Sequence, residues 1–238
     1  MKTLTRLFSP LLASALLLTS FVATAARETR EVANFNQVAL SGSATVVLVQ
    51  GSPQKVEVQA ETEDLSHLET TVNSGRLRIG TKQESGMKWS NYKFKGPVTV
   101  YVTTPNISAL TVSGSGRMKA ANGVKAQALD LNVSGSGNME LGPVQADELE
   151  TTISGSGGIS IDSGSAPRQT IRISGSGGVQ APKLQTQKCN VRISGSGNCR
   201  VHASETLQAS ISGSGNVYVT GGASVSSSTS GSGRVRQE

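Results

Sequence analysis

Aromatic side chains are scarce in this 238-residue chain: one Trp, three Tyr and four Phe make up only 3% of it, whereas hydrophobic residues reach 36%. A core with so few large rings must be filled by small and branched aliphatic side chains, which suits a thin core. This composition argues against helix bundles and nucleotide-binding α/β folds. Beyond the amino terminus, no apolar run reaches the ~20 residues that a membrane-spanning helix needs.

The charge excess is also small. Without the two basic residues of the amino-terminal segment, 20 basic residues stand against 16 acidic ones, a net charge of +4. Such an excess gives only a weak attraction for anionic partners, and no nucleic acid is expected among them.

The amino terminus has the pattern of a secretory signal peptide. Lys2 and Arg6 precede an apolar run over residues 7–18, and residues 23–25, Ala-Thr-Ala, form a small-residue cleavage site. We therefore expect residues 1–25 to be removed. Because no cysteine near the site can accept a lipid, the expected product is a soluble periplasmic or extracellular protein and not a lipoprotein.

Glycine, by contrast, is abundant and periodic. Of the 27 glycines, 14 lie in seven copies of Ser-Gly-Ser-Gly, which follow one another at spacings of 21, 20, 20, 20, 18 and 18 residues. A fixed period of this length is the signature of a repeat fold, and glycine permits a sharp corner in each repeat. The corner glycines are Gly114, Gly116, Gly135, Gly137, Gly155, Gly157, Gly175, Gly177, Gly195, Gly197, Gly213, Gly215, Gly231 and Gly233.

The residues that flank each corner alternate between apolar and polar. The position before the first Ser is Val or Ile in six of the seven copies, and the residue before that is polar throughout. This two-residue period predicts two short strands per repeat, each burying one face. Such units must stack on one another, so we predict an all-β fold: a parallel β-solenoid of about seven to eight rungs, roughly 4.8 Å apart.

The repeat array, residues 106–238, follows a less regular region, residues 26–105, and we expect one continuous domain. Residues 41–44, Ser-Gly-Ser-Ala, have the spacing of a degenerate first rung. Turn residues at 50–53 and at 73–75 predict two β-hairpins. Such hairpins would cap the open amino-terminal end of the core.

Several motifs together resemble one known family. They are the opening Phe35-Asn36-Gln37-Val38-Ala39-Leu40-Ser41-Gly42, a strand ending at Thr104-Pro105, and Leu110-Thr111-Val112 before the first of the repeated corners. This combination resembles the head GIN domain putative adhesin family over residues 34–236. The resemblance implies a secreted or envelope protein with β-helical repeats, and it supplies no established catalytic or binding residues. The array departs from its own pattern at residues 226–229, where Ser and Thr replace core aliphatics, so we expect a weaker last rung.

The array offers little for catalysis. A polysaccharide-active enzyme would need clustered carboxylates, but Asp130, Asp147 and Asp162 fall at different repeat offsets. The corners lack the third glycine of a dinucleotide loop, the lysine of a phosphate loop and the aspartates of a calcium repeat. His67 and His202 are isolated. We therefore predict no enzyme activity, no cofactor and no metal site.

Two sets of residues are candidates for binding an anionic glycan or another envelope component. The first interleaves aromatic rings with lysines and comprises Lys88, Trp89, Tyr92, Lys93, Phe94 and Lys95. Rings flanked by cations can stack on sugars and attract acidic groups, but the same residues could instead plug the end of the core.

The second set is a stripe of outward-facing cations, expected at Arg117, Lys119, Arg172, Arg192, Arg200, Arg234 and Arg236. A stripe of this kind could hold an acidic polysaccharide, or it could be a solvated surface and no more.

Cys189 and Cys199 are the only cysteines, and each lies five residues from Ser194 at an offset that is mainly apolar in other repeats. Both are expected to point inward. Two alternatives follow: a disulfide across the rung in an oxidising envelope, or two buried free thiols.

We interpret the chain as a non-catalytic secreted or cell-envelope β-solenoid that acts as an adhesin-like binding module. Two alternatives stay open. A structural protein that self-assembles as a homo-oligomer through the solenoid ends would be favoured by unpaired strand edges in residues 225–236. A polysaccharide-active enzyme would be favoured by carboxylates clustered on one face.

Overall fold

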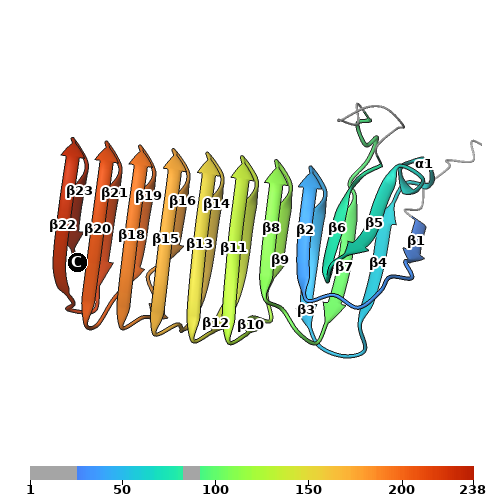
Figure 1. Cartoon of the computed structure of the whole chain (residues 1–238). Coiled ribbons are helices and arrows are strands. Elements are labelled where there is room, and N and C mark those ends of the chain that lie inside the picture. Colours follow the sequence, from blue (N-terminus) through green and yellow to red (C-terminus); the bar gives the residue numbers. More distant parts are fainter. Residues whose placement is uncertain (1–25, 83–91) are drawn as a thin grey trace, which may run out of the picture.

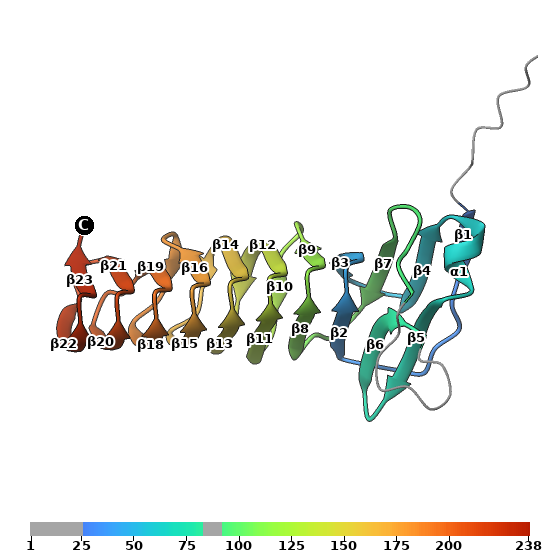
Figure 2. The same cartoon turned by 90° about the horizontal axis from the view of Figure 1, so that it is seen from above.

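The chain forms a parallel β-solenoid of about six turns, in a computed structural model that describes residues 26–82 and 92–238. The predicted signal peptide, residues 1–25, lies outside the described residues. Successive turns stack along one axis (Figure 1), and two sheets form opposite walls of the array (Figure 2). Within the described ranges, no helix has both the length and the apolar character needed to cross a membrane.

The first wall is a 10-stranded sheet. In spatial order it contains β22 (Ser224–Gly231), β20 (Thr206–Gly213), β18 (Lys188–Gly195), β15 (Arg168–Gly175), β13 (Glu148–Gly155), β11 (Ala128–Gly135), β8 (Ala109–Gly114), β2 (Gln37–Gly42), β6 (Arg76–Thr81) and β5 (Leu68–Asn73).

The second wall is a 13-stranded sheet. Its main path contains β1 (Ala26–Thr29), β4 (Lys55–Ala60), β7 (Thr99–Thr104), β3 (Thr45–Gln50), β9 (Arg117–Ala120), β12 (Asn138–Gln145), β14 (Gly158–Ser165), β16 (Gly178–Ala181), β19 (Asn198–His202), β21 (Asn216–Thr220) and β23 (Arg234–Gln237). Two short strands, β10 (Val124–Lys125) and β17 (Leu184–Gln185), pair at its side with β12 and β14.

Burial along the strands confirms the predicted two-residue period. In β11, Leu129, Leu131 and Val133 are buried while Ala128 and Asp130 are exposed. The next turn repeats this arrangement in register, so that equivalent aliphatic side chains stack into ladders through the core. Each fully buried Leu, Ile or Val contributes about 1.5–3 kcal/mol relative to an exposed one. The ladders therefore supply the hydrophobic stabilisation that the missing aromatic rings cannot.

The number of turns is slightly lower than predicted, because the seven corners enclose only six complete turns, from Gly114 to Gly231. The segment with the degenerate corner also joins the stack. Ser41 pairs with Ser113 and Gly42 pairs with Gly114. The chain then leaves the stack after β3 to build the amino-terminal cap, and it returns at β8.

The cap confirms one predicted hairpin and corrects the other. β5 and β6 pair antiparallel across residues 73–75, as predicted. β3 and β4 do not pair, so the hairpin predicted at residues 50–53 is wrong. β7 lies between them and pairs parallel with β3 and antiparallel with β4. Its residues are far from both strands in the sequence. A local turn signal cannot reveal that a distant strand will be inserted between its two arms.

The last turn has polar residues on its inward face, and its two strands, β22 and β23, end the two sheets, so each pairs along one edge only. β22 is in register with β20 along all eight residues. Val225 is half-buried, whereas the inward positions Ser227 and Thr229 are exposed at the end of the stack. The open edges are those that self-assembly through this end would use, whereas the polar inward side chains, like those of a terminal capping repeat, offer little apolar surface for another copy to bury.

The corners depend on glycine for two reasons. The first glycine of every Ser-Gly-Ser-Gly copy has a φ between +105° and +124°, a region that L side chains rarely adopt. At Gly155, φ is +120° and a Cβ atom would lie 2.4 Å from the carbonyl oxygen of Gly135 in the preceding corner. The same oxygen accepts hydrogen bonds from the N–H groups of Ser156 at 2.9 Å and Gly157 at 3.0 Å. Strain and a steric clash would therefore act together against any side chain.

Replacing Gly155 with Ala is expected to lower the free energy of unfolding by about 3 kcal/mol, because it adds backbone strain and the clash with Gly135. Gly42→Ala is the matched control: Gly42 has a φ of +106° but no atom within 4 Å of the added Cβ, so only strain of about 1 kcal/mol is expected. Urea denaturation of both variants measures the difference. Equal losses would show that the contact between corners adds nothing.

Candidate binding surfaces

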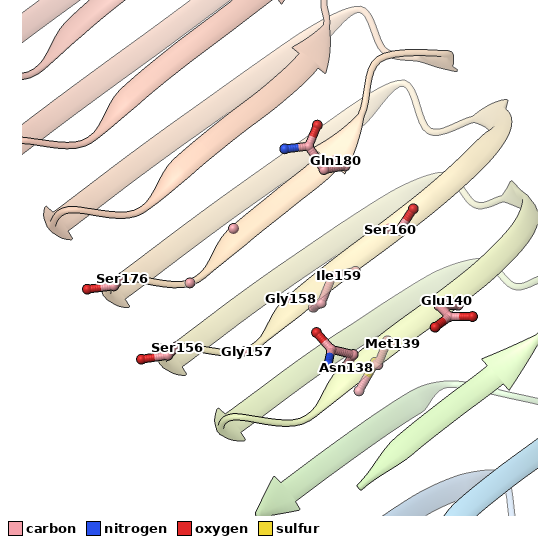
Figure 3. Close-up of a pocket in the computed structure, with 12 residues that line it drawn as sticks. Asn138, Met139, Glu140, Ser156, Gly157, Gly158, Ile159, Ser160, Ser176 and Gln180 are labelled. Atoms are coloured by element: carbon pink, nitrogen blue, oxygen red, sulfur yellow. The ribbon is translucent and has the colours of Figure 1, made fainter. Parts of the chain in front are cut away.

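A trough lies on the outer face of the 13-stranded sheet, in the middle of the array. The residue directly after the corner is Asn or Arg in five turns: Arg117, Asn138, Asn198, Asn216 and Arg234. In the two turns between Asn138 and Asn198 this residue is glycine, Gly158 and Gly178. The missing side chains leave a hollow of about 410 Å³ (Figure 3).

The backbone does not require glycine at these two positions. Neither residue has a positive φ. A Cβ atom at Gly158 would lie 3.0 Å from Oδ1 of Asn138, and one at Gly178 would lie 3.1 Å from the carbonyl oxygen of Asn198. Shifts of a few tenths of an ångström would accommodate them. The trough is thus a feature of the sequence at two positions and not a consequence of the solenoid geometry.

Amide and hydroxyl groups surround the trough. Asn138, Ser160 and Gln180 come from β12, β14 and β16 and project from the same face, while Ser156 and Ser176 lie at the adjoining corners (Figure 3). These groups both donate and accept hydrogen bonds. The arrangement can therefore bind a ligand that is rich in hydroxyl groups.

One acidic and one basic side chain lie at opposite ends of the trough. Glu140, the one carboxylate in the lining, forms ion pairs with Nε of Arg117 at 3.2 Å and Nζ of Lys119 at 3.0 Å. Arg200 follows Gln180 in register on the next strand. Its guanidinium carbon lies 5.1 Å from the ring centroid of Tyr218. Nη2 of Arg200 also lies 3.5 Å from Oε1 of Glu238, so Arg200 is a positioned and partly neutralised cation beside the trough.

The cations do not form the single stripe that we predicted. Arg172 and Arg192 project from the 10-stranded sheet, whereas Arg200 and the other predicted cations project from the 13-stranded sheet. The corner between the two strands of a turn explains this difference. Outward-facing residues before and after a corner lie on opposite walls, although they are close in the sequence.

The structure also places together two carboxylates that the sequence analysis did not pair. Asp130 and Glu150 are register neighbours on β11 and β13. Burial, and then the charge of Glu150, raise the pKa of Asp130. The offsets of the aspartates alone do not reveal this pair, because it consists of one Asp and one Glu. Glu150 is tied to Arg172 by an ion pair, and Nε of Arg168 lies 2.7 Å from Oε1 of Glu148.

Comparison with known proteins identifies the family. Residues 34–223 match the family model described as "Putative auto-transporter adhesin, head GIN domain". The chain belongs to this family. The resemblance noted in the sequence is therefore confirmed. A search of curated proteins gives no match.

Solved structures of similar proteins share the fold of this head GIN domain. A "putative adhesin" from Bacteroides fragilis has a TM-score of 0.81 at 18% identity, covering 90% of this chain and 96% of that one. A "putative lipid binding protein" from Parabacteroides distasonis has a TM-score of 0.77 at 25% identity, covering 91% and 98%. A "putative adhesin" from the same species has a TM-score of 0.72 at 26% identity, also covering 91% and 98%.

In this head GIN domain, the described part of the aromatic and basic segment, residues 92–95, packs against the cap. Trp89 and Lys88 lie outside the described residues. The rings of Tyr92 and His67 stack with centroids 3.7 Å apart, and Phe94 packs against the core. Lys93 is exposed. These contacts favour the cap alternative for the part of the segment that the structure describes.

A buried carboxylate organises this cap. Asp64, in α1 (Thr62–Leu65), accepts a hydrogen bond of 2.6 Å from the Tyr92 hydroxyl and bonds of 3.1 Å from the backbone N–H groups of Lys95 and Gly96. The Lys95 side chain pairs with Glu63. Burial by itself would raise the pKa of Asp64, but these hydrogen bonds outweigh it and hold the pKa below the usual 3.8. The same contact raises the pKa of Tyr92 to about 12.

Both cysteines point inward, as predicted, and the structure contains them as free thiols. The corner occupies residues 194–197, so Cys189 lies five residues before it whereas Cys199 lies two residues after it. At ~3.3 Å per residue, the two positions are displaced by roughly 10 Å along the strands. The second of the two alternatives, buried free thiols, is the one seen here.

The lowered pKa of Asp64 predicts a pH-dependent contribution to stability. Because its pKa is lower in the folded state, the carboxylate stabilises the fold fully above about pH 4, and the contribution is lost as the pH falls through the lowered value. Asp64→Asn should therefore reduce the melting temperature clearly at pH 7 and progressively less toward pH 3. Asp162→Asn, at an exposed position, is the control and should change little at either pH. A decrease in melting temperature for Asp64→Asn that is the same at both pH values would contradict this account.

The buried thiols predict strong protection from alkylation. Burial raises the pKa of Cys189 to about 12 and also raises that of Cys199. At pH 8 the native protein should react with iodoacetamide far more slowly than after denaturation, when two thiols per chain should be titrated. Mass spectrometry of the alkylated protein measures both states. Finding no thiols in the denatured, unreduced protein would show that a disulfide forms instead.

Proposed function

We propose that this chain is a non-catalytic, exported adhesion module that binds a glycan in the trough of the 13-stranded sheet. The observation that carries the proposal is a pair of glycines on adjacent turns, Gly158 and Gly178. They occupy a register position that carries Asn or Arg in the other five turns of the array. The family and two similar solved structures are described as putative adhesins, which supports the class of function.

The chemistry of the trough suits a sugar. Side-chain amides at Asn138 and Gln180 and the hydroxyl of Ser160 supply donors and acceptors at the spacing of adjacent strands, ~4.8 Å. This spacing is comparable with the length of one sugar ring. Arg200, at the edge, would accept an acidic sugar. Most of the trough's surface is apolar, so the polar groups would orient the ligand while the C–H faces of its sugar rings pack against the floor.

The carboxylates do not favour an enzyme. Glycoside hydrolysis generally uses two carboxyl groups that flank one bond, and the trough has a single one, Glu140, already paired with two cations. On the opposite wall Asp130 lies beside Glu150, but Glu148 and Glu150 are both engaged with arginines, so Asp130 has no free carboxylate as its partner there. Among residues 26–82 and 92–238, no group of three His, Cys, Asp or Glu residues is placed to hold a metal ion.

Export is the part of the proposal that rests on sequence alone. The basic start, the apolar run over residues 7–18 and the small residues at 23–25 support transport across the inner membrane into the periplasm or beyond.

Filling the trough tests the proposal. The double variant Gly158→Asn, Gly178→Asn inserts the side chain that two neighbouring turns carry, so it should keep the fold and weaken glycan binding at least tenfold. Polygalacturonate and its neutral methyl ester, immobilised on a biosensor, are probes with the same sugar backbone that differ in the methylation, and hence the charge, of the carboxyl groups. Arg200→Gln should weaken binding to the acidic probe more than to the ester.

The control is Ser210→Asn, an equivalent change on the opposite wall. It should leave binding unchanged, and all variants should melt within a few degrees of the parent protein. Glycan binding that persists after the trough is filled would assign the ligand to another surface.

A further inference from the structure

Charges on the outer face of the 10-stranded sheet change sign along the solenoid axis. Two neighbouring strands, β11 and β13, carry acidic side chains, and the next two, β15 and β18, carry basic ones. The charged residues are Asp130, Glu148, Glu150, Arg168, Arg172, Lys188 and Arg192. The following strand, β20, carries Thr, Gln and Ser on this face. The sign therefore changes at the boundary between β13 and β15.

The charges at this boundary compensate one another. Nε of Arg168 lies 2.7 Å from Oε1 of Glu148, and Arg172 pairs with Glu150. These four side chains are half-exposed, so the ion pairs add little to stability by themselves. They do hold the centre of the face close to neutral.

The charges on either side of the boundary are not compensated within the chain. Asp130 on β11, and Lys188 and Arg192 on β18, have no oppositely charged group within 4 Å among residues 26–82 and 92–238. Asp130 instead faces Glu150 across the strand pair, and Arg192 faces Arg172. Like charges in register cost stability. Each flank therefore has an unfavourable pair that an opposite charge from outside would relieve.

The two flanks fit each other in a second copy of the chain. A twofold axis in the interface, along the strands and midway between β13 and β15, places β11 of each copy over β18 of the other. Register connects Asp130 through the intervening strands to Asn190 on β18. Asp130 would thus lie over Asn190 of the second copy. Lys188 and Arg192 are two residues, roughly 7 Å, to either side.

We infer that the outer face of β11, β13, β15 and β18 binds a second copy of this chain, with the two solenoids antiparallel. The interface is isologous, since each acidic flank meets the basic flank of the other copy. Shallow hollows of about 220 Å³ and 280 Å³ on this face leave room for side chains to interdigitate. Four strands of eight residues cover roughly 500 Å² on each copy, at the low end for specific interfaces, so the dimer is weak and sensitive to salt.

This dimer goes beyond the proposed function and does not depend on it. It buries the 10-stranded sheet and leaves both troughs exposed on the outer walls. If the troughs bind glycan as proposed, the dimer is bivalent, with its two sites facing in opposite directions.

Charge-swapped variants of the mature chain test the inference by sedimentation equilibrium at low ionic strength. Asp130→Lys alone, and Lys188→Asp with Arg192→Asp, should each weaken self-association at least tenfold. An equimolar mixture of the two variants should associate again, because every contact across the twofold axis then joins opposite charges. Arg236→Asp, on the opposite wall, is the matched control and should associate like the parent.

Three results would overturn the inference. The parent may be monomeric at all concentrations and bind soluble polygalacturonate through Lys188 and Arg192, which would assign these cations to an anionic ligand. The mixture of variants may stay monomeric. Self-association may persist in both variants but be lost in Ser227→Lys, which would place the contact at the carboxy-terminal end. Filling the trough with Gly158→Asn and Gly178→Asn should leave the dimer intact, so the dimer and the proposed function fail separately.

Discussion

Every turn of this solenoid is positioned by the contact between a glycine of one corner and a carbonyl oxygen of the corner before it. At Gly157 a Cβ atom would lie 2.2 Å from the carbonyl oxygen of Gly137, closer than any side chain could fit. The same carbonyl oxygen of Gly137 accepts a hydrogen bond from the N–H of Gly158 at 3.2 Å. The turns can therefore stack at the spacing of a β-ladder only if both glycines are present. Other features of the fold follow from this stacking.

Stacked corners fix the register of both walls, and register determines what each residue type can do. Inward positions form continuous ladders, so an aliphatic residue in one turn constrains the next, and Thr229 at the open end is free of that constraint. Outward positions pack against no layer and can vary from turn to turn. Core packing therefore cannot explain why an outward position differs from its equivalents in other turns. Gly158, which stands where neighbouring turns have asparagine, is such a position.

The sequence predicted the solenoid well because its two determinants, the corner motif and the two-residue period, are local. It failed where the determinant was distant. The inserted strand β7 pairs with β3 through Val100 and Val46, more than 50 residues apart, and no turn residue signals that event. The surfaces were also hard to predict, since a corner sends Arg192 and Arg200 to opposite walls although they are eight residues apart. Conversely, Asp130 and Glu150 are 20 residues apart in the sequence and are neighbours on the sheet. Residues of one surface site are therefore separated by the repeat length in the sequence.

The two walls have different surface chemistry, and the fold places these surfaces back to back. The trough lies on β14 and β16, which directly follow β13 and β15, the strands on either side of the change in charge. In an antiparallel pair of solenoids, the twofold axis therefore passes between the two troughs. Three sheet-to-sheet spacings of ~10 Å separate them, so the troughs open in opposite directions about 30 Å apart. One glycan strand lying flat cannot occupy both. A pair with this geometry joins two separate surfaces, which is the mechanical requirement of an adhesion protein and not of a receptor for a single chain.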